Sequence, residues 1–151
     1  MFGAQTIASE GKLYLPYGSE KHAPITAADI ARVVAAILAE PADHVGERYV
    51  LTGPRNVSMA EAAEVISLEI GKPVEHVDLP IDVWGQLLGQ VDDMSESLVK
   101  HLEAVASDHQ QGVFSGETDV VERIGGQPPE TLEAVVHRHR TTFGASVAKA
   151  S

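Results

Sequence analysis

Two residues near the start of the chain have types and a spacing that suit acid catalysis. Tyr17 and Lys21 lie four positions apart. On an α-helix this spacing places both side chains on one face, one turn or ~5.4 Å apart, where the lysine charge would lower the pKa of the tyrosine and let it act as an acid. Pro16 and Gly18 instead predict a turn at this point. The sequence therefore favours a loop, and no catalytic residue is assigned.

A second group, His137 and His139 with Arg138 and Arg140, raises the question of a metal or phosphate site. Side chains two positions apart on a helix point to different faces, whereas a metal-binding pair on a helix needs a spacing of four. The two arginines suit a solvated face near a helix C-terminus, where cations are favourable. We therefore predict no metal site. The whole sequence also lacks cysteine, which excludes disulfides and cysteine-ligated zinc.

A helix is expected to begin at Thr26, a suitable N-cap, and to end before Pro41. Its apolar residues recur at spacings of three and four, which predicts one buried stripe. The stripe consists of Ile30, Val33, Val34, Ile37 and Leu38. Small alanines on the same helix predict that it lies close to a sheet.

A capping box marks the next helix. Ser58 is the expected N-cap with Glu61 three residues later, and Gly71 is the expected end of this helix. Strands are predicted at residues 13–16, 49–51 and 74–79, the last of them at a sheet edge. Other helices are predicted at residues 1–9, at 81–88, from Ser95 or Ser97 toward Gly112, at 120–124 and at 132–143.

Three phrases, at residues 22–38, 46–80 and 127–143, occur in an order that resembles the back half of NmrA-like proteins, an atypical branch of the short-chain dehydrogenase/reductase superfamily. The turn Thr52-Gly53-Pro54 followed by a capped helix is similar to the family's crossing into its substrate domain. The resemblance covers nearly the whole chain. It implies an α/β fold in which the C-terminal strands of a partial Rossmann-type sheet carry a smaller, mainly helical substrate-side lobe.

The glycine-rich loop by which that family holds a dinucleotide is absent from this sequence. Neither Gly-x-Gly-x-x-Gly nor Gly-x-x-Gly-x-x-Gly occurs in it. Such glycines allow a helix N-terminus to approach a pyrophosphate closely. We therefore expect that the N-terminal Rossmann half is lacking and that the chain holds no cofactor on its own. NAD(P) is implied by the resemblance alone.

The resemblance also suggests where a ligand would bind. It places His109 and Phe114 near the substrate-side cleft, and it places Trp84, the only tryptophan, in a helix over the same side. These three residues would line a pocket for a small apolar ligand. The alternative is structural, with His109 at a helix end, Phe114 as a buried anchor and Trp84 in the core. The residues alone leave both interpretations open.

Composition narrows the function classes. A chain of 151 residues suggests one domain, expected at 1–143, before a small, polar tail at 144–151 that is expected to be disordered. The formal net charge of −11 disfavours binding to nucleic acid or to anionic membranes. No apolar run reaches the ~18 residues of a membrane span, and the first residues do not resemble a signal peptide. These features favour a cytoplasmic protein.

Three functions remain. The preferred one is the substrate-side half of an NmrA-like NAD(P)-binding protein, without catalysis or nucleotide binding by itself. The others are a free-standing module that binds a small ligand or a protein partner, and an NAD(P)H-dependent reductase that works once a Rossmann half complements it. A partial parallel sheet would expose an edge and an apolar face, which natural proteins cover. The expected partner is therefore a second copy of the chain or a complementary Rossmann-type chain.

Overall fold

A small parallel sheet joins two distant parts of the chain. The computed structural model describes residues 3–145. In it β1 (Lys12–Tyr14) pairs in parallel with β2 (Glu75–Val77), and Leu13 lies opposite His76. The helices are α1 (Ala4–Glu10), α2 (Ala27–Ala39), the 3-10 helix η1 (Pro41–His44), α3 (Met59–Ile70), α4 (Ile81–Leu88), α5 (Glu96–Gln110), α6 (Val120–Gly125) and α7 (Leu132–Arg138). The predicted α/β class is confirmed.

Several helix boundaries follow the caps predicted from the sequence. Ser58 and Glu61 form the full capping box, with each side chain bonded to the other's backbone N–H. Gly71 ends α3 in the left-handed conformation, with φ 68°, which glycine adopts without strain. Ser95, rather than Ser97, caps α5. Of the predicted tail at 144–151, only the first two residues lie within the described part of the chain.

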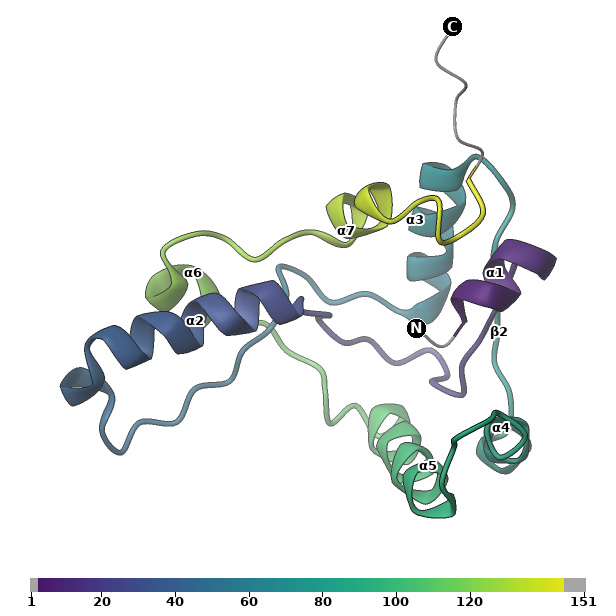
Figure 1. The fold of residues 1–151 in the computed structure, drawn as a ribbon, viewed down its shortest axis with the longest axis horizontal. Coiled ribbons are helices and arrows are strands. Elements are labelled where there is room, and N and C mark those ends of the chain that lie inside the picture. The colour runs from purple at the N-terminus through teal and green to yellow at the C-terminus, as the bar shows by residue number, and fades with distance from the viewer. Residues whose placement is uncertain (1–2, 146–151) are drawn as a thin grey trace, which may run out of the picture.

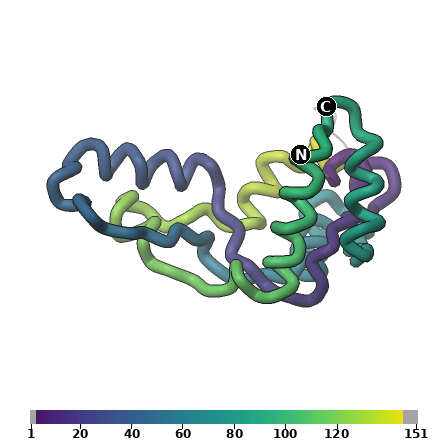
Figure 2. Tube along the Cα trace, turned by 90° about the horizontal axis from the view of Figure 1, so that it is seen from below, coloured from purple at the N-terminus to yellow at the C-terminus, as the bar shows by residue number. Residues whose placement is uncertain are grey.

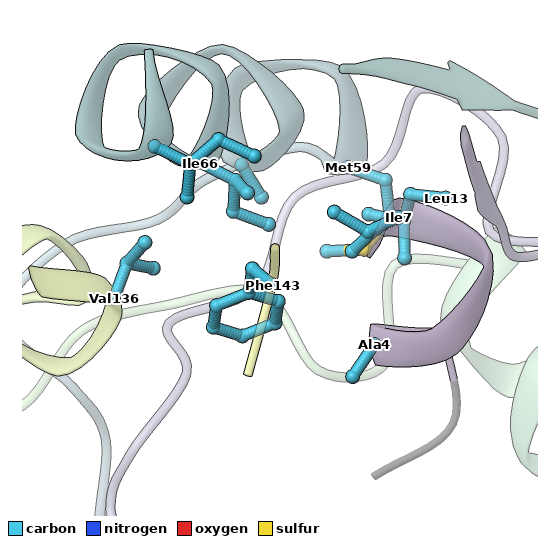
Figure 3. Close-up of a cluster of buried hydrophobic side chains, with 9 residues drawn as sticks. Ala4, Ile7, Leu13, Met59, Ile66, Val136 and Phe143 are labelled. Carbon is cyan, nitrogen blue, oxygen red and sulfur yellow. The ribbon is translucent and has the colours of Figure 1, made fainter. Parts of the chain in front are cut away.

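The main hydrophobic core lies between α1, β1, α3 and α7 (Figure 3). As predicted, α3 turns Ala62, Ile66 and Ile70 toward it. Val136 of α7 and Phe143 close the other side. Each fully buried aliphatic side chain of this kind contributes roughly 1.5–3 kcal/mol. The buried members of the cluster are Ala4, Ile7, Leu13, Met59, Ala62, Ile66, Ile70, Val136 and Phe143.

A second, smaller core lies between α4 and α5. Trp84 and Leu88 of α4 are buried there with Ala106 of α5. Leu15 and Tyr17 pack against both cores. The segment that follows β1 therefore ties the two cores together.

α2 and α6 form an arm that extends away from both cores (Figures 1 and 2). The two helices pack against each other, and Val33 on α2 and Val121 on α6 are only 1% and 0% exposed. The buried stripe predicted for α2 is nevertheless wrong. Ile30, Val34 and Leu38 are 40%, 46% and 71% exposed, because α6 covers only one side of α2. An apolar face of α2 is thus left in solvent.

Asp29 links the first turn of α2 to the segment before α7. It is 3% exposed, and its carboxylate accepts hydrogen bonds from Thr26 Oγ1 at 2.7 Å, from the Glu130 backbone N–H at 3.0 Å and from an Arg32 guanidinium nitrogen at 2.9 Å. A buried carboxylate is tolerated only when it is bonded in this way. Asp29 therefore holds the segment before α7 against the first turn of α2.

The strand predicted at residues 49–51 does not form within the described part of the chain. A strand needs a neighbouring strand to pair with, and here Thr118 bonds to this segment instead. Thr118 Oγ1 donates to the Val50 carbonyl at 2.7 Å, and the Thr118 N–H donates to Thr52 Oγ1 at 2.9 Å. This segment therefore has no strand partner among the described residues, although its Val50 carbonyl is bonded to Thr118, and Val50 is 56% exposed.

Gly53 marks a close approach between two backbone segments. Its N–H donates to the Ala23 carbonyl at 3.0 Å, and a Cβ at this position would lie 1.9 Å from the Pro24 carbonyl oxygen. Next to it, His22 and Val57 form an isolated antiparallel bridge. The close packing fixes the position of His22 in the molecule.

Candidate functional site

Two histidines from distant parts of the chain share a hydrogen bond. His109, near the end of α5, places Nε2 2.9 Å from Nδ1 of His22. The two rings are nearly perpendicular, at 77°, with centroids 4.8 Å apart. His109 is 3% exposed. Two histidines that lie 87 positions apart in the sequence are thus joined by one hydrogen bond.

Tyr17 covers one face of His109. The rings stack with centroids 4.2 Å apart and planes at 14°. As predicted, the chain turns at Gly18, and Lys21 points into an ion pair with Glu61 at 2.5 Å. Burial raises the pKa of Tyr17, which is the opposite of what an acid catalyst needs. The Tyr17–Lys21 spacing therefore forms no catalytic pair here.

Both histidines are held in the neutral form. Burial, followed by the nearby His109 ring, lowers the pKa of His22 to about 4. Burial also lowers the pKa of His109, an effect that the Tyr17 backbone and the Glu20 carboxylate partly oppose. Near pH 7 one neutral ring must donate and the other must accept. The pair of histidines therefore forms hydrogen bonds but carries no charge near pH 7.

His22 and Phe114 line a cavity of about 340 Å³ at the base of the arm. This volume falls within the range of small-molecule sites. Phe114 is 43% exposed, and its ring centroid lies 6.2 Å from that of His109. The lining residues are His22, Ala23, Pro24, Ile25, Val50, Leu51, Thr52, Val113, Phe114 and Ser115. The wall is mostly apolar with a few polar groups, as is usual for a ligand site.

Trp84 lies in a different place. Its side chain, 5% exposed, borders a groove of about 680 Å³ between α1 and α4. Leu79, Leu87 and Val91 continue the apolar wall of this groove. The structure thus brings His109 and Phe114 together and places Trp84 at a separate groove.

The side chains of His137 and Arg138 are engaged by carboxylates. His137 Nδ1 bonds to Glu69 at 2.9 Å, and Arg138 pairs with Glu130. Over residues 3–145, no group of three His, Cys, Asp or Glu side chains is arranged to hold a metal ion. The same range contains no helix that combines the length and the apolar character of a membrane span.

The helix N-termini of the described residues do not fit a dinucleotide. A pyrophosphate is bound by free backbone N–H groups at the positive end of a helix dipole. Here every α-helix from α2 to α7 has a carboxylate in its first turn, which repels phosphate. These residues are Asp29, Glu61, Asp82, Glu96, Glu122 and Glu133. α1 has none, but it spans only 7 residues.

Sequence reasoning missed His22 and the stacking role of Tyr17. Both belong to extended segments without helical spacing, and their partner lies on α5. A hydrogen bond across 87 residues leaves no local signal in one sequence. The nearest clue was Pro24, which favours extended backbone at Ala23, next to the bridge between His22 and Val57.

Comparison with known proteins agrees with the fold. The model of the NmrA-like family matches residues 4–136. An NAD(P)H azoreductase of Xenophilus azovorans is 32% identical over 143 residues, which are 95% of this chain and 49% of the azoreductase. An NADPH-dependent quinone oxidoreductase from Escherichia coli has a similar structure, with a TM-score of 0.83 at 23% identity over 91% of this chain and 49% of that one. The structure of the Citrobacter triphenylmethane reductase is also similar, with a TM-score of 0.76 at 21% sequence identity. The match covers 88% of this chain and 46% of that one.

The two solved structures are similar in fold, and the azoreductase is similar in sequence as well. The chain spans about half the length of each of these relatives. The match to the family model nevertheless covers most of the residues that the structure describes. On this evidence the chain belongs to the NmrA-like family.

Proposed function

We propose that this chain is the substrate-binding half of an NAD(P)H-dependent reductase and that a separate Rossmann-type unit holds the dinucleotide. The observation that carries the proposal is the cavity lined by His22 and Phe114, beside helix N-termini that are occupied by carboxylates. The cavity suits an uncharged organic ligand, whereas the helix N-termini disfavour phosphate. By itself the chain neither binds NAD(P)H nor catalyses a reaction.

The names of the relatives indicate a substrate class. They describe an azoreductase, a quinone oxidoreductase and a triphenylmethane reductase. Azo compounds, quinones and triphenylmethane dyes are all conjugated aromatic electron acceptors. The cavity provides Phe114 and Pro24 as apolar walls for a flat ring, with His22 as a polar contact. We infer that the substrate is an aromatic electron acceptor of this kind.

The arm is the surface for the Rossmann-type unit. Ile30, Val34 and Leu38 repeat every four residues along α2 and are exposed. The segment near Val50, which has no strand partner among the described residues, follows α2 in the sequence. An apolar helix face and a segment without a strand partner are the two features that another sheet would cover. A second copy of the chain is the alternative occupant.

The test compares this chain with a fusion. The half of the Xenophilus azovorans azoreductase that this chain does not match is joined to it, and NADPH binding and dye reduction are measured for both proteins. We expect no NADPH binding by the chain alone, and binding with reduction of an azo dye or a quinone by the fusion. NADPH binding by the chain alone, measured by calorimetry, would contradict the proposal.

A free-standing ligand-binding module is the second candidate. The groove beside Trp84, about 680 Å³ in volume and mostly apolar in its lining, favours it. This function predicts that a small apolar ligand raises the melting temperature of the chain and changes Trp84 fluorescence, with no Rossmann unit present. A ligand at 100 times its Kd adds about 2.7 kcal/mol to the stability of the native state. An unchanged melt across an apolar ligand series would exclude the module.

A further inference from the structure

We propose that the groove between α1 and α4 binds a small organic cation, an amine with an apolar body, and that the Glu10 carboxylate receives its ammonium group. This is the groove that Trp84 borders, and none of its lining residues belongs to the Phe114 cavity. The inference therefore goes beyond the proposed substrate site. For the free-standing module, the second candidate function, it names the class of ligand.

The first step is the apolar wall of the groove. Trp84 and Leu88 of α4 are buried in the smaller core, so this part of the wall is packed without a ligand. Leu87 and Val91 line the same groove and are each 48% exposed. Covering such apolar side chains removes their surface from water, which is favourable. The groove therefore offers a binding surface to the apolar body of a ligand.

The second step is the charge. Glu10, the last residue of α1, is the one charged side chain among the described residues that line the groove. Its Oε2 accepts a hydrogen bond from the Tyr14 hydroxyl at 3.0 Å. Within residues 3–145 it forms no ion pair with a Lys, Arg or His side chain. A carboxylate accepts about four hydrogen bonds, so a single neutral hydroxyl leaves it able to accept from a charged donor.

Lys12 is the cation of the chain to be weighed against Glu10. It lies two residues before Tyr14 on β1, which places both side chains on one face of the strand. The hydrogen bond to Glu10 raises the pKa of Tyr14, and the Lys12 charge opposes this with a smaller effect. Lys12 is also not among the residues that line the groove. The carboxylate is therefore the stronger influence at this end of the groove.

The third step is the match to a ligand. The net charge of −11 attracts cations to the chain and repels anions. Trp84 and Tyr14 give the groove aromatic surface, beside which an ammonium group is stabilised. An amine with an apolar body fits both the apolar wall and the carboxylate, whereas Glu10 would repel an organic acid of the same shape.

The test uses the full chain with two probes of similar shape, tryptamine, which is protonated near pH 7, and the neutral alcohol tryptophol. We expect the wild type to bind tryptamine roughly three- to tenfold more tightly, the combined value of a partly exposed ion pair and a contact between a cation and an aromatic ring. Glu10→Gln should abolish this preference, although its amide oxygen can still accept from Tyr14. Glu64→Gln on the exposed side of α3 removes the same unit of net charge and should keep the preference. Equal affinities of the wild type for both probes, or equal losses in both variants, would overturn the proposal.

A second variant separates the apolar wall from the charge. Leu87→Ala shortens a half-exposed side chain of the groove, so it should weaken both probes by a similar factor and leave their ratio unchanged. In the ¹⁵N-labelled chain, tryptamine should shift the indole N–H signal of Trp84. Tryptamine that binds without shifting this signal overturns the proposal. Neither measurement involves a Rossmann-type unit, so the fusion experiment tests the proposed function independently.

Discussion

Nε2 of His109 lies 2.9 Å from Nδ1 of His22, and this contact joins α5 to the extended segment that precedes α2. The same contact connects the cavity at the base of the arm to the stacked ring of Tyr17. A mutation in α5 can therefore alter a cavity whose walls all come from other segments. The pair also makes the stability of the fold depend on pH.

We predict that the free energy of unfolding falls as the pH drops from about 6.5 to about 4. His22 takes up a proton near pH 6.5 when unfolded but only near pH 4 when folded, so the unfolded state binds more protons between these values. The stabilisation is complete above pH 6.5. Because the ring is partly exposed, we discount the shift and expect His22 to account for about 1–2 kcal/mol. Urea unfolding at pH 5.0 and 6.5 measures the loss. His22→Gln should show a smaller difference between the two pH values, and an equal difference would contradict the assignment.

Asp29→Ala should destabilise the chain by about 2–4 kcal/mol, because it removes a buried carboxylate and leaves the groups that bonded to it without their acceptor. Two of those groups are Arg32 and the Glu130 backbone N–H. The matched control is Glu96→Ala, whose partner Lys100 is exposed and whose loss should change the stability far less. Chemical denaturation of both variants measures the difference. Equal costs would show that Asp29 does not fasten the arm.

Gly53→Ala should destabilise the fold strongly, by about 3 kcal/mol or more, since the new Cβ would lie 1.9 Å from the Pro24 carbonyl oxygen and the two backbones would have to separate. Gly89 is the control. A Cβ there meets no atom closer than 3.5 Å, and the residue has a helical backbone with φ −64°. We expect Gly89→Ala to change the melting temperature little. A mild effect of Gly53→Ala would mean that the two segments are free to move apart.

Val34→Lys should leave the stability of the isolated chain within about 0.5 kcal/mol of wild type, because the side chain is 46% exposed. Val33→Lys, one residue earlier, should unfold the arm because Val33 is 1% exposed. If α2 is the surface for a Rossmann-type unit or a second copy, Val34→Lys should also weaken that association. Light scattering after size-exclusion chromatography, at micromolar concentration, would detect it. Association that is unaffected by Val34→Lys would place the interface elsewhere.

Local signals in the sequence predicted several helix boundaries well, although α7 ends at Arg138 and not at 143 as predicted. The capping box at Ser58 and Glu61 and the left-handed glycine at 71 act within a few residues, so one sequence is enough to find them. Burial of α2 was predicted poorly, because periodicity shows that a helix has an apolar face but not that anything covers it. The strand at 49–51 failed for a related reason, since strand pairing depends on a neighbour that the described residues do not supply.

The candidate site was predicted only in part. His109 and Phe114 were chosen by resemblance, and they do lie near each other, with ring centroids 6.2 Å apart. Trp84 was grouped with them but borders another groove, between α1 and α4, which only the tertiary packing of these helices reveals. His22 escaped detection because a single histidine in an extended segment has no pattern of its own. Its partner is identified only by the tertiary structure.

The arm built from α2 and α6 has a consequence for the dynamics of the chain. Its helices pack mainly on each other, so it is expected to open as one cooperative unit at a lower free energy than α3, which packs against the main core. Amide protons in α2 should therefore exchange with deuterium well before those in α3. Ligand or protein binding at the base of the arm would slow this exchange, so deuterium uptake along α2 is a sensitive report of what the molecule binds.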